Sequence, residues 1–278
     1  MVRIALAQID SSIGEVEANL EHIGELTAEA NSQGADLTVF PELATHGYAL
    51  GKIPHVRGLC ADDPRLTELS SGRSHVLVGF LEVGSLRTYN AAAYLAGGAV
   101  VHVQRKLYLP NYLSWEERKH TSPGQSLRSF DTLHGRAATL ICNDAWQPVL
   151  PWLVAQDGAE LVLIPANSAA NLGPESFDTI EYWRHLLVYI ARMQQCWVVF
   201  VNRVGTEAGA RFWGGSRVLD PTGEVVAEAP LWQPALITID VDLGAARHRR
   251  HEVPLLAEAR LALIEREVSR LISGGGDI

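Results

Sequence analysis

Cysteine is scarce in this chain of 278 residues, which contains Cys60, Cys142 and Cys196 and no others. An odd and small number of cysteines excludes a disulfide framework and favours a reducing compartment. No apolar run approaches the roughly 20 residues that span a bilayer, and the apolar part of the N-terminal segment is too short for a secretory signal. We therefore expect a cytoplasmic protein with no membrane partner.

Basic residues are outnumbered, because 23 Lys and Arg against 32 Asp and Glu give a net charge of −9. This balance argues against non-specific nucleic-acid binding, which requires clustered positive charge, and we expect no nucleic-acid partner. The one basic run, at 247–251, is typical of a solvated face or an interface edge. No Pro-, Gly- or Ser-rich linker interrupts the chain, so we expect a single domain over 1–278 with a frayed tail at 273–278.

Several common catalytic signatures are missing. The sequence contains no Gly-x-Ser-x-Gly elbow and no Gly-x-Gly-x-x-Gly, and its nearest approach to a P-loop, at 47–52, is one residue short and is followed by Ile53. The ten histidines are scattered, and His248 and His251 lie beside three arginines, a poor environment for a cation. We expect no metal and no cofactor.

Short apolar runs alternate with longer segments of helical periodicity, a pattern typical of an α/β or layered-sheet protein. A loop-like stretch is expected at 109–125. The pattern predicts helices at 15–33, 150–157, 178–195 and 255–272, and strands at 2–9, 37–40, 75–83, 89–95, 99–104, 137–142, 161–164, 197–202, 216–220, 224–227 and 235–241.

One segment of the sequence echoes another. Gly-Ala-Asp-Leu-Thr-Val-Phe-Pro at 34–41 resembles Gly-Ala-Glu-Leu-Val-Leu-Ile-Pro at 158–165, and each follows a predicted helix. The echo indicates two similar halves, each a helix and a strand packed on a sheet. A chance match is the alternative, because helix–Gly–strand is a common connection.

Cys142 ends the predicted strand 137–142 and precedes a turn, Pro148 and a helix. This placement suits a nucleophile, because the strand holds the sulfur and the turn directs backbone N–H groups at a developing oxyanion. The plainer interpretation, a small core residue, is favoured by position alone. It also suits Cys196, while Cys60 lies near a loop.

Glu42 and Lys106 each follow a predicted strand. A partly desolvated carboxylate at a strand end can act as a base, although Glu42 could equally form a salt bridge or a helix cap. For Lys106 the plainer interpretation is a solvated side chain, the usual state of lysine.

Taken together, three segments resemble the signature motifs of the nitrilase, or carbon–nitrogen hydrolase, superfamily. They are Phe-Pro-Glu-Leu at 40–43, Arg-Lys-Leu-Tyr-Leu-Pro at 105–110 and Leu-Ile-Cys-Asn-Asp-Ala-Trp at 140–146. The segments at 4–8, 202–205 and 212–224 resemble further motifs of that family, so the resemblance covers nearly the whole chain. It implies a four-layer α-β-β-α sandwich, a homodimer or higher homo-oligomer, and a Glu-Lys-Cys triad of Glu42, Lys106 and Cys142.

The resemblance also implies how the triad works. Glu42 takes the thiol proton and later activates water, Lys106 favours the thiolate and stabilises the oxyanion, and the backbone N–H of Asn143 is the second oxyanion donor. The family carries another glutamate before a Pro-Gly pair, and Glu117 matches it, with Glu116 as a near miss. Both could instead be solvated acids.

Further pocket residues are proposed from their places in or near the motif loops. Aromatic residues at such positions are as often core as pocket. The candidates are Tyr48, Tyr112, Trp115, Trp146, Trp183 and, at the end of the strand that echoes the Pro41 strand, Asn167.

The branch of the family is indicated by Asn143 and Asp144, where true nitrilases have tryptophan and glutamate. We therefore expect a small-molecule amide substrate. The segments 41–48 and 109–112 are similar to glutaminase domains of glutamine-dependent NAD synthetases, although we expect no ATP-using domain. His46 departs from the small or hydroxyl residue usual there and would narrow or re-polarise the pocket mouth. The alternatives are a glutaminase-like ammonia-supplying subunit, an N-carbamoyl amine hydrolase, a nitrilase and a catalytically silent scaffold or binding subunit.

Overall fold

Two six-stranded sheets form the body of the protein in the computed structural model, which describes residues 1–53, 57–112, 115–172 and 177–275. A separate hairpin pairs β10 (Val204–Glu207) with β11 (Ala210–Trp213). The first sheet has the order β14 (Ala235–Val241), β1 (Val2–Gln8), β2 (Leu37–Val39), β3 (His75–Val83), β4 (Thr88–Ala96) and β5 (Ala99–Arg105). The second has the order β13 (Val225–Glu228), β12 (Arg217–Leu219), β9 (Trp197–Asn202), β8 (Leu161–Ala166), β7 (Gly135–Thr139) and β6 (Phe130–Thr132).

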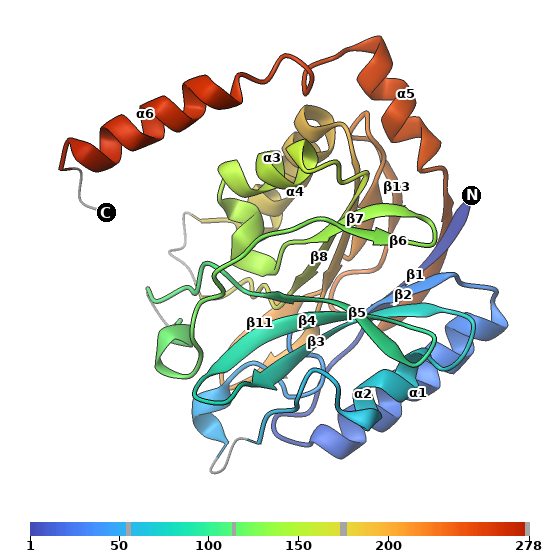
Figure 1. Ribbon diagram of the computed structural model, residues 1–278. Helices are drawn as coiled ribbons and strands as arrows, with labels where there is room; N and C mark the ends of the chain where they lie inside the picture. The colour runs from blue at the N-terminus through green and yellow to red at the C-terminus, as the bar shows by residue number, and fades with distance from the viewer. Residues whose placement is uncertain (54–56, 113–114, 173–176, 276–278) are drawn as a thin grey trace.

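Helices cover the outer face of each sheet (Figure 1). The first sheet packs against α1 (Val16–Ser32) and α2 (Pro64–Thr67), and the second against α3 (Val149–Gln156) and α4 (Thr179–Gln194). One apolar core lies between the two sheets and draws on both, with Leu6 and Leu163 among its buried members. The predicted α-β-β-α sandwich is therefore confirmed.

The echo in the sequence marks equivalent places in the two sheets. β2 lies between β1 and β3 in a parallel trio, and β8 lies between β7 and β9 in another. Each echo segment begins with a glycine that follows a helix. Both glycines have left-handed backbone conformations, with φ 80° at Gly34 and φ 89° at Gly158. A side chain is unfavourable there, so the shared glycine has a physical reason in each half.

Most predicted elements lie within two residues of their observed bounds, and the remaining differences are as follows. The prediction of one strand over 137–142 is wrong, because β7 ends at Thr139 and Cys142 begins the 3-10 helix η4 (Cys142–Trp146). The final helix starts later than predicted, as α6 (Leu261–Ser273). The strands β6, β10 and β11 and the short helix α2 were not predicted. The stretch 109–125 contains a 3-10 turn, η3 (Glu117–Lys119), and its residues 113–114 lie outside the described part.

The basic run at 247–251 belongs to a further helix that was not predicted, α5 (Gly244–Glu252). Arg247 binds both carboxylate oxygens of Glu160 at 2.8 Å, and Arg250 donates to the carbonyl oxygens of Ala159, Gln194 and Gln195. The run is therefore only partly a solvated face, because two of its arginines tie α5 to the body.

Helix α6 reaches away from the sandwich (Figure 1), and none of its residues is buried. Its large apolar side chains recur at helical spacing and form an exposed stripe, which consists of Leu261, Ile264, Val268, Leu271 and Ile272. Residues 276–278 of the predicted tail lie outside the described part. Among the described helices, none is both long and apolar enough to cross a membrane.

Candidate active site

The candidate residues meet where strands of both sheets end. Glu42 lies three residues beyond β2, Lys106 directly follows β5, and Asn167 directly follows β8. Cys142 lies three residues beyond β7. Ligand sites in parallel α/β sheets form at the carboxyl ends of the strands, and this arrangement follows the same principle with two sheets instead of one.

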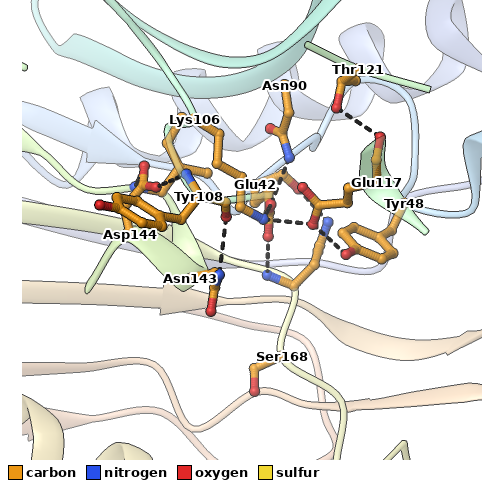
Figure 2. A network of polar contacts seen from close by, with 12 residues as sticks. Glu42, Tyr48, Asn90, Lys106, Tyr108, Glu117, Thr121, Asn143, Asp144 and Ser168 are labelled. Atoms are coloured by element: carbon orange, nitrogen blue, oxygen red, sulfur yellow. Dashed lines mark hydrogen bonds and ion pairs between the residues drawn. The ribbon is translucent and has the colours of Figure 1, made fainter. Parts of the chain in front are cut away.

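Lys106 lies at the centre of a buried charge cluster (Figure 2). Its ammonium donates to Glu42 Oε1 and to Glu117 Oε1, each at 2.6 Å. Asn90 Nδ2 donates to the same Glu42 oxygen at 2.7 Å, and the Tyr48 hydroxyl donates to Glu117 Oε1. One cation is thus shared by two carboxylates, each of which has a further neutral donor.

Backbone geometry holds Glu42 in the interior. The backbone of 41–43 passes so close to β3 that a Cβ at Gly79 would lie 2.7 Å from Glu42 Cα and 2.4 Å from the Leu43 nitrogen. Only glycine permits this approach. Asn167, which follows β8 of the second sheet, contacts Glu42 twice. Its backbone N–H donates to Glu42 Oε2 at 2.8 Å, and its Nδ2 donates to the Glu42 carbonyl oxygen at 2.8 Å.

Cys142 occupies a strained turn. Its φ of 48° lies in the left-handed region, which costs a non-glycine residue on the order of 1–3 kcal/mol. Asp144 stabilises the turn, because its carboxylate accepts from the N–H groups of Ile141, Leu107 and Tyr108 at 3.3, 3.0 and 2.8 Å. The same carboxylate therefore fixes the Cys142 turn against the segment that carries Lys106.

Burial and charge decide the protonation states of the cluster. Burial opposes the charged form of Lys106, but the charges of Glu117 and Glu42 outweigh it and keep the pKa of Lys106 well above its ordinary value. Burial, with Lys106 acting against it, raises the pKa of Glu117 to about 7. Of two carboxylates on one cation, Glu117 thus titrates near neutrality.

The Cys142 thiol is neutral at rest. Burial raises its pKa well above the ordinary value, the charges of Glu42 and Glu117 raise it further, and Lys106 and the Asn167 N–H only partly offset this. The charge of Lys106 favours the thiolate, but burial and two carboxylates outweigh one cation. Attack by the sulfur requires a base.

A cavity of about 380 Å³ opens at Cys142 and is called the Cys142 cavity below. All six predicted pocket residues line it, and so does Asn143. Tyr112 is 56% exposed, and Trp183 is 1% exposed. The complete lining is Tyr48, Pro110, Tyr112, Trp115, Cys142, Asn143, Trp146, Asn167, Ser168, Ala169, Leu172, Phe177, Thr179 and Trp183.

Asn143 is the second residue of η4, and its side chain donates to the Tyr108 carbonyl oxygen at 3.1 Å. The first N–H groups of a helix have no partner within the helix, so the backbone N–H of Asn143 suits an oxyanion donor. Glu116, the near miss, is exposed and pairs with Lys119 at 2.7 Å, whereas Glu117 is buried in the cluster.

Several residues of the site carried no signal in the sequence. Ser168 lines the cavity, and its hydroxyl oxygen accepts from the indole N–H groups of Trp183 and Trp213 at 2.9 and 3.0 Å. Glu207 accepts from the Tyr48 backbone N–H at 2.8 Å and is paired with buried Arg203 at 2.8 Å. Such contacts depend on where loops fold back, which spacing along the chain does not show.

His46 does not line the Cys142 cavity, so the expectation that it shapes the pocket mouth is wrong. Its ring is buried between the Thr45 hydroxyl at 2.6 Å and the Arg57 carbonyl oxygen at 3.0 Å. Within the described residues, no three His, Cys, Asp or Glu side chains are grouped so that they could hold a metal ion.

This combination of a layered sandwich, a buried Glu-Lys-Glu cluster and an adjacent cysteine defines a class of hydrolases. The sequence matches the carbon–nitrogen hydrolase family over residues 3–251, and the chain belongs to that family.

Particular relatives differ in length and activity. The glutamine-dependent NAD(+) synthetase of Thermotoga maritima is 30% identical over 249 residues, which are 87% of this chain and 42% of the synthetase. The chain thus spans less than half of that relative. An omega-amidase of Bos taurus is 28% identical over 279 residues, 96% of this chain and 98% of the amidase.

A solved structure of a variant of the amidase from Nesterenkonia sp. AN1 has a TM-score of 0.77 and 26% identity, and the match covers 91% of this chain and 98% of the amidase. That structure carries the product of Michael addition of acrylamide at the active-site cysteine of the amidase. The relatives together support hydrolysis of carbon–nitrogen bonds in general.

Proposed function

We propose that the chain hydrolyses a small-molecule amide through a thioester on Cys142. The observation that carries this proposal is the ammonium of Lys106 held at 2.6 Å by both Glu42 and Glu117, beside a cavity that contains a neutral thiol. A buried cation has a large desolvation cost unless it is paired, and its position next to a nucleophile suits the stabilisation of an oxyanion.

The reaction proceeds in two halves. Glu42 takes the proton from Cys142 as the sulfur attacks the amide carbon, and the oxyanion is stabilised by Lys106 and the Asn143 backbone N–H. The carbon–nitrogen bond breaks, the nitrogen leaves with the proton from Glu42, and a thioester remains. Glu42 then takes a proton from water, whose oxygen attacks the thioester, and the carboxylic acid and the thiol are released. Glu117, which also accepts from the Tyr48 hydroxyl, holds Lys106 in place.

Ammonia and acid release from a panel of small aliphatic and aromatic amides, glutamine, N-carbamoyl amines and nitriles tests the proposal, with Cys142→Ala beside it. Release from an amide that disappears in Cys142→Ala is expected. Release from nitriles or N-carbamoyl amines alone would reassign the substrate. If no compound is turned over and Cys142 reacts with iodoacetamide no faster than exposed Cys60 and buried Cys196, the chain is a silent scaffold and the proposal fails.

We also propose a homodimer or higher homo-oligomer and a cytoplasmic location. The apolar stripe of α6 supports assembly, because such a face is normally buried against a partner. The three free cysteines support a reducing compartment. Light scattering measures the first, and fractionation of a cell lysate the second.

A further inference from the structure

The Cys142 cavity is lined mainly by aromatic and apolar side chains with a few neutral polar ones among them, and no lining side chain carries a fixed charge. Of the residues that line it, none is Lys, Arg, Asp or Glu. The segments outside the described part, 54–56, 113–114, 173–176 and 276–278, contain no lysine or arginine. A counter-charge for a carboxylate in the substrate therefore has no source among the lining residues or in those segments.

An acidic group beside the cavity, Asp178, also disfavours an anion. Helix α4 begins at Thr179, which lines the cavity. The N–H groups of Ile180 and Glu181 already donate to the Asp178 carboxylate at 3.0 and 3.1 Å. The N-terminus of this helix therefore presents a negative charge of its own instead of free donors.

The polar atoms that remain suit a neutral amide. Asn167 Oδ1 is buried and has no hydrogen-bond partner among the described residues. This oxygen is a hydrogen-bond acceptor. The N–H of a primary amide can donate to it, whereas a carboxylate has no hydrogen to donate. The Ser168 hydroxyl oxygen already accepts hydrogen bonds from two indoles. Towards a ligand in the cavity, this hydroxyl can therefore only donate a hydrogen bond.

One side of the cavity carries an aromatic cluster next to the nucleophile. Trp146 lies in the same 3-10 helix as Cys142. Its ring centroid is 5.4 Å from that of Trp183, nearly perpendicular at 83°, and 5.9 Å from that of Phe177. All three line the cavity, which gives a flat acyl group apolar surfaces on which to pack.

From these observations we infer that the site selects amides with a neutral, apolar and preferably aromatic acyl group, and rejects amides with a carboxylate in the acyl chain, glutamine among them. The inference rests on the proposed function and narrows it to a substrate class. It separates this chain from an ammonia-supplying role that would require glutamine.

The charge of the acyl group is tested with one pair of compounds, the monoamide of glutaric acid and its methyl ester, which differ in charge while the reacting amide is the same. Ammonia release should have a kcat/KM at least about a hundredfold higher for the ester. Glutamine should resemble the acid. Equal or faster release from the acid or from glutamine would overturn the inference and leave amide hydrolysis intact, whereas no release from any amide, propanamide included, would refute the proposed function itself.

The aromatic cluster is tested by the ratio of kcat/KM for 3-phenylpropanamide to that for propanamide. We expect a ratio of about ten or more, because the ring is buried, and a fall of about tenfold in that ratio in Trp146→Ala. The ratio does not depend on the folded fraction of the variant. Trp232→Ala, in which a partly exposed indole against Arg211 is removed away from the cavity, should keep the ratio. An unchanged ratio in Trp146→Ala would contradict a role of the cluster in selectivity.

Discussion

Replacing Lys106 by methionine tests whether the buried cluster depends on its single cation. The ammonium is fully buried and is bonded at 2.6 Å to each of two carboxylates. Methionine nearly preserves the volume and removes the charge, which leaves Glu42 and Glu117 facing one another. Breaking a buried ion pair in this way costs about 3–5 kcal/mol, and the loss should be at the upper end because two acids lose their partner.

The loss should depend on pH. The pKa of Glu117 is already raised to about 7 by burial, and it should rise further without Lys106. A carboxyl group whose pKa is raised on folding gives stability that is present below its unfolded value, near 4.5, and is lost as the pH rises through the folded value. The Lys106→Met protein should therefore unfold more easily at pH 8 than at pH 5, because protonation of Glu117 at pH 5 removes the repulsion.

Urea unfolding at pH 5 and pH 8 measures both effects. Lys119→Met is the matched control, because Lys119 pairs with Glu116 on the surface, with side chains 62% and 54% exposed, and such pairs contribute about 0–1 kcal/mol. The double variant Lys106→Met/Glu117→Gln should recover part of the stability and lose its pH dependence. A Lys106→Met protein as stable as the Lys119→Met protein at pH 8 would refute the shared-cation arrangement.

Three further predictions address other contacts. In Tyr48→Phe, loss of the hydroxyl that donates to Glu117 should raise the pKa of Glu117 above about 7. We expect kcat/KM to fall about tenfold. The inflection that Glu117 gives to the pH profile of kcat/KM should move to higher pH. Tyr108→Phe should change neither kcat/KM nor the position of that inflection. Burial lowers the pKa of His46 from 6.5 to about 4, so about 3 kcal/mol of stability present above pH 6.5 should be lost as the pH falls towards 4, and urea midpoints of His46→Gln should lack this decline. Val268→Glu in the apolar stripe of α6 should lower the molar mass measured by light scattering, and an unchanged mass would place the interface elsewhere.

Much of the fold was predictable because each sheet is built from buried apolar strands separated by helices with regular periodicity. For the strand Trp197–Asn202, the predicted first and last residues are the observed ones. The missed elements carry weak patterns: β6 is three residues long, and α5 has a single buried residue, Ala246. Its helical structure is supported by the contacts of Arg247 and Arg250 with distant segments, which local periodicity does not encode.

The residues of the site also fall into two groups, those that a sequence motif indicates and those that only the fold brings into the site. Glu42, Lys106 and Cys142 lie in motifs, so their positions could be proposed from the sequence, and their catalytic roles remain a proposal. Asn90 contacts Glu42 across 48 residues of sequence, and its part in the cluster follows only from the pairing of strands. How strongly the neutral form of the Cys142 thiol is favoured could not be read from the sequence, because burial, Glu42 and Glu117 raise its pKa while Lys106 lowers it, and all of these depend on positions in space.

The left-handed backbone at Cys142 has a consequence for laboratory evolution. Glycine adopts this conformation freely, whereas cysteine and alanine carry the same strain there. Glycine at position 142 would therefore relieve the backbone strain and remove the sulfur in one step. A library selected for thermal tolerance alone should enrich Cys142→Gly and discard the proposed nucleophile, so a stabilised variant would have to be selected for turnover in every round.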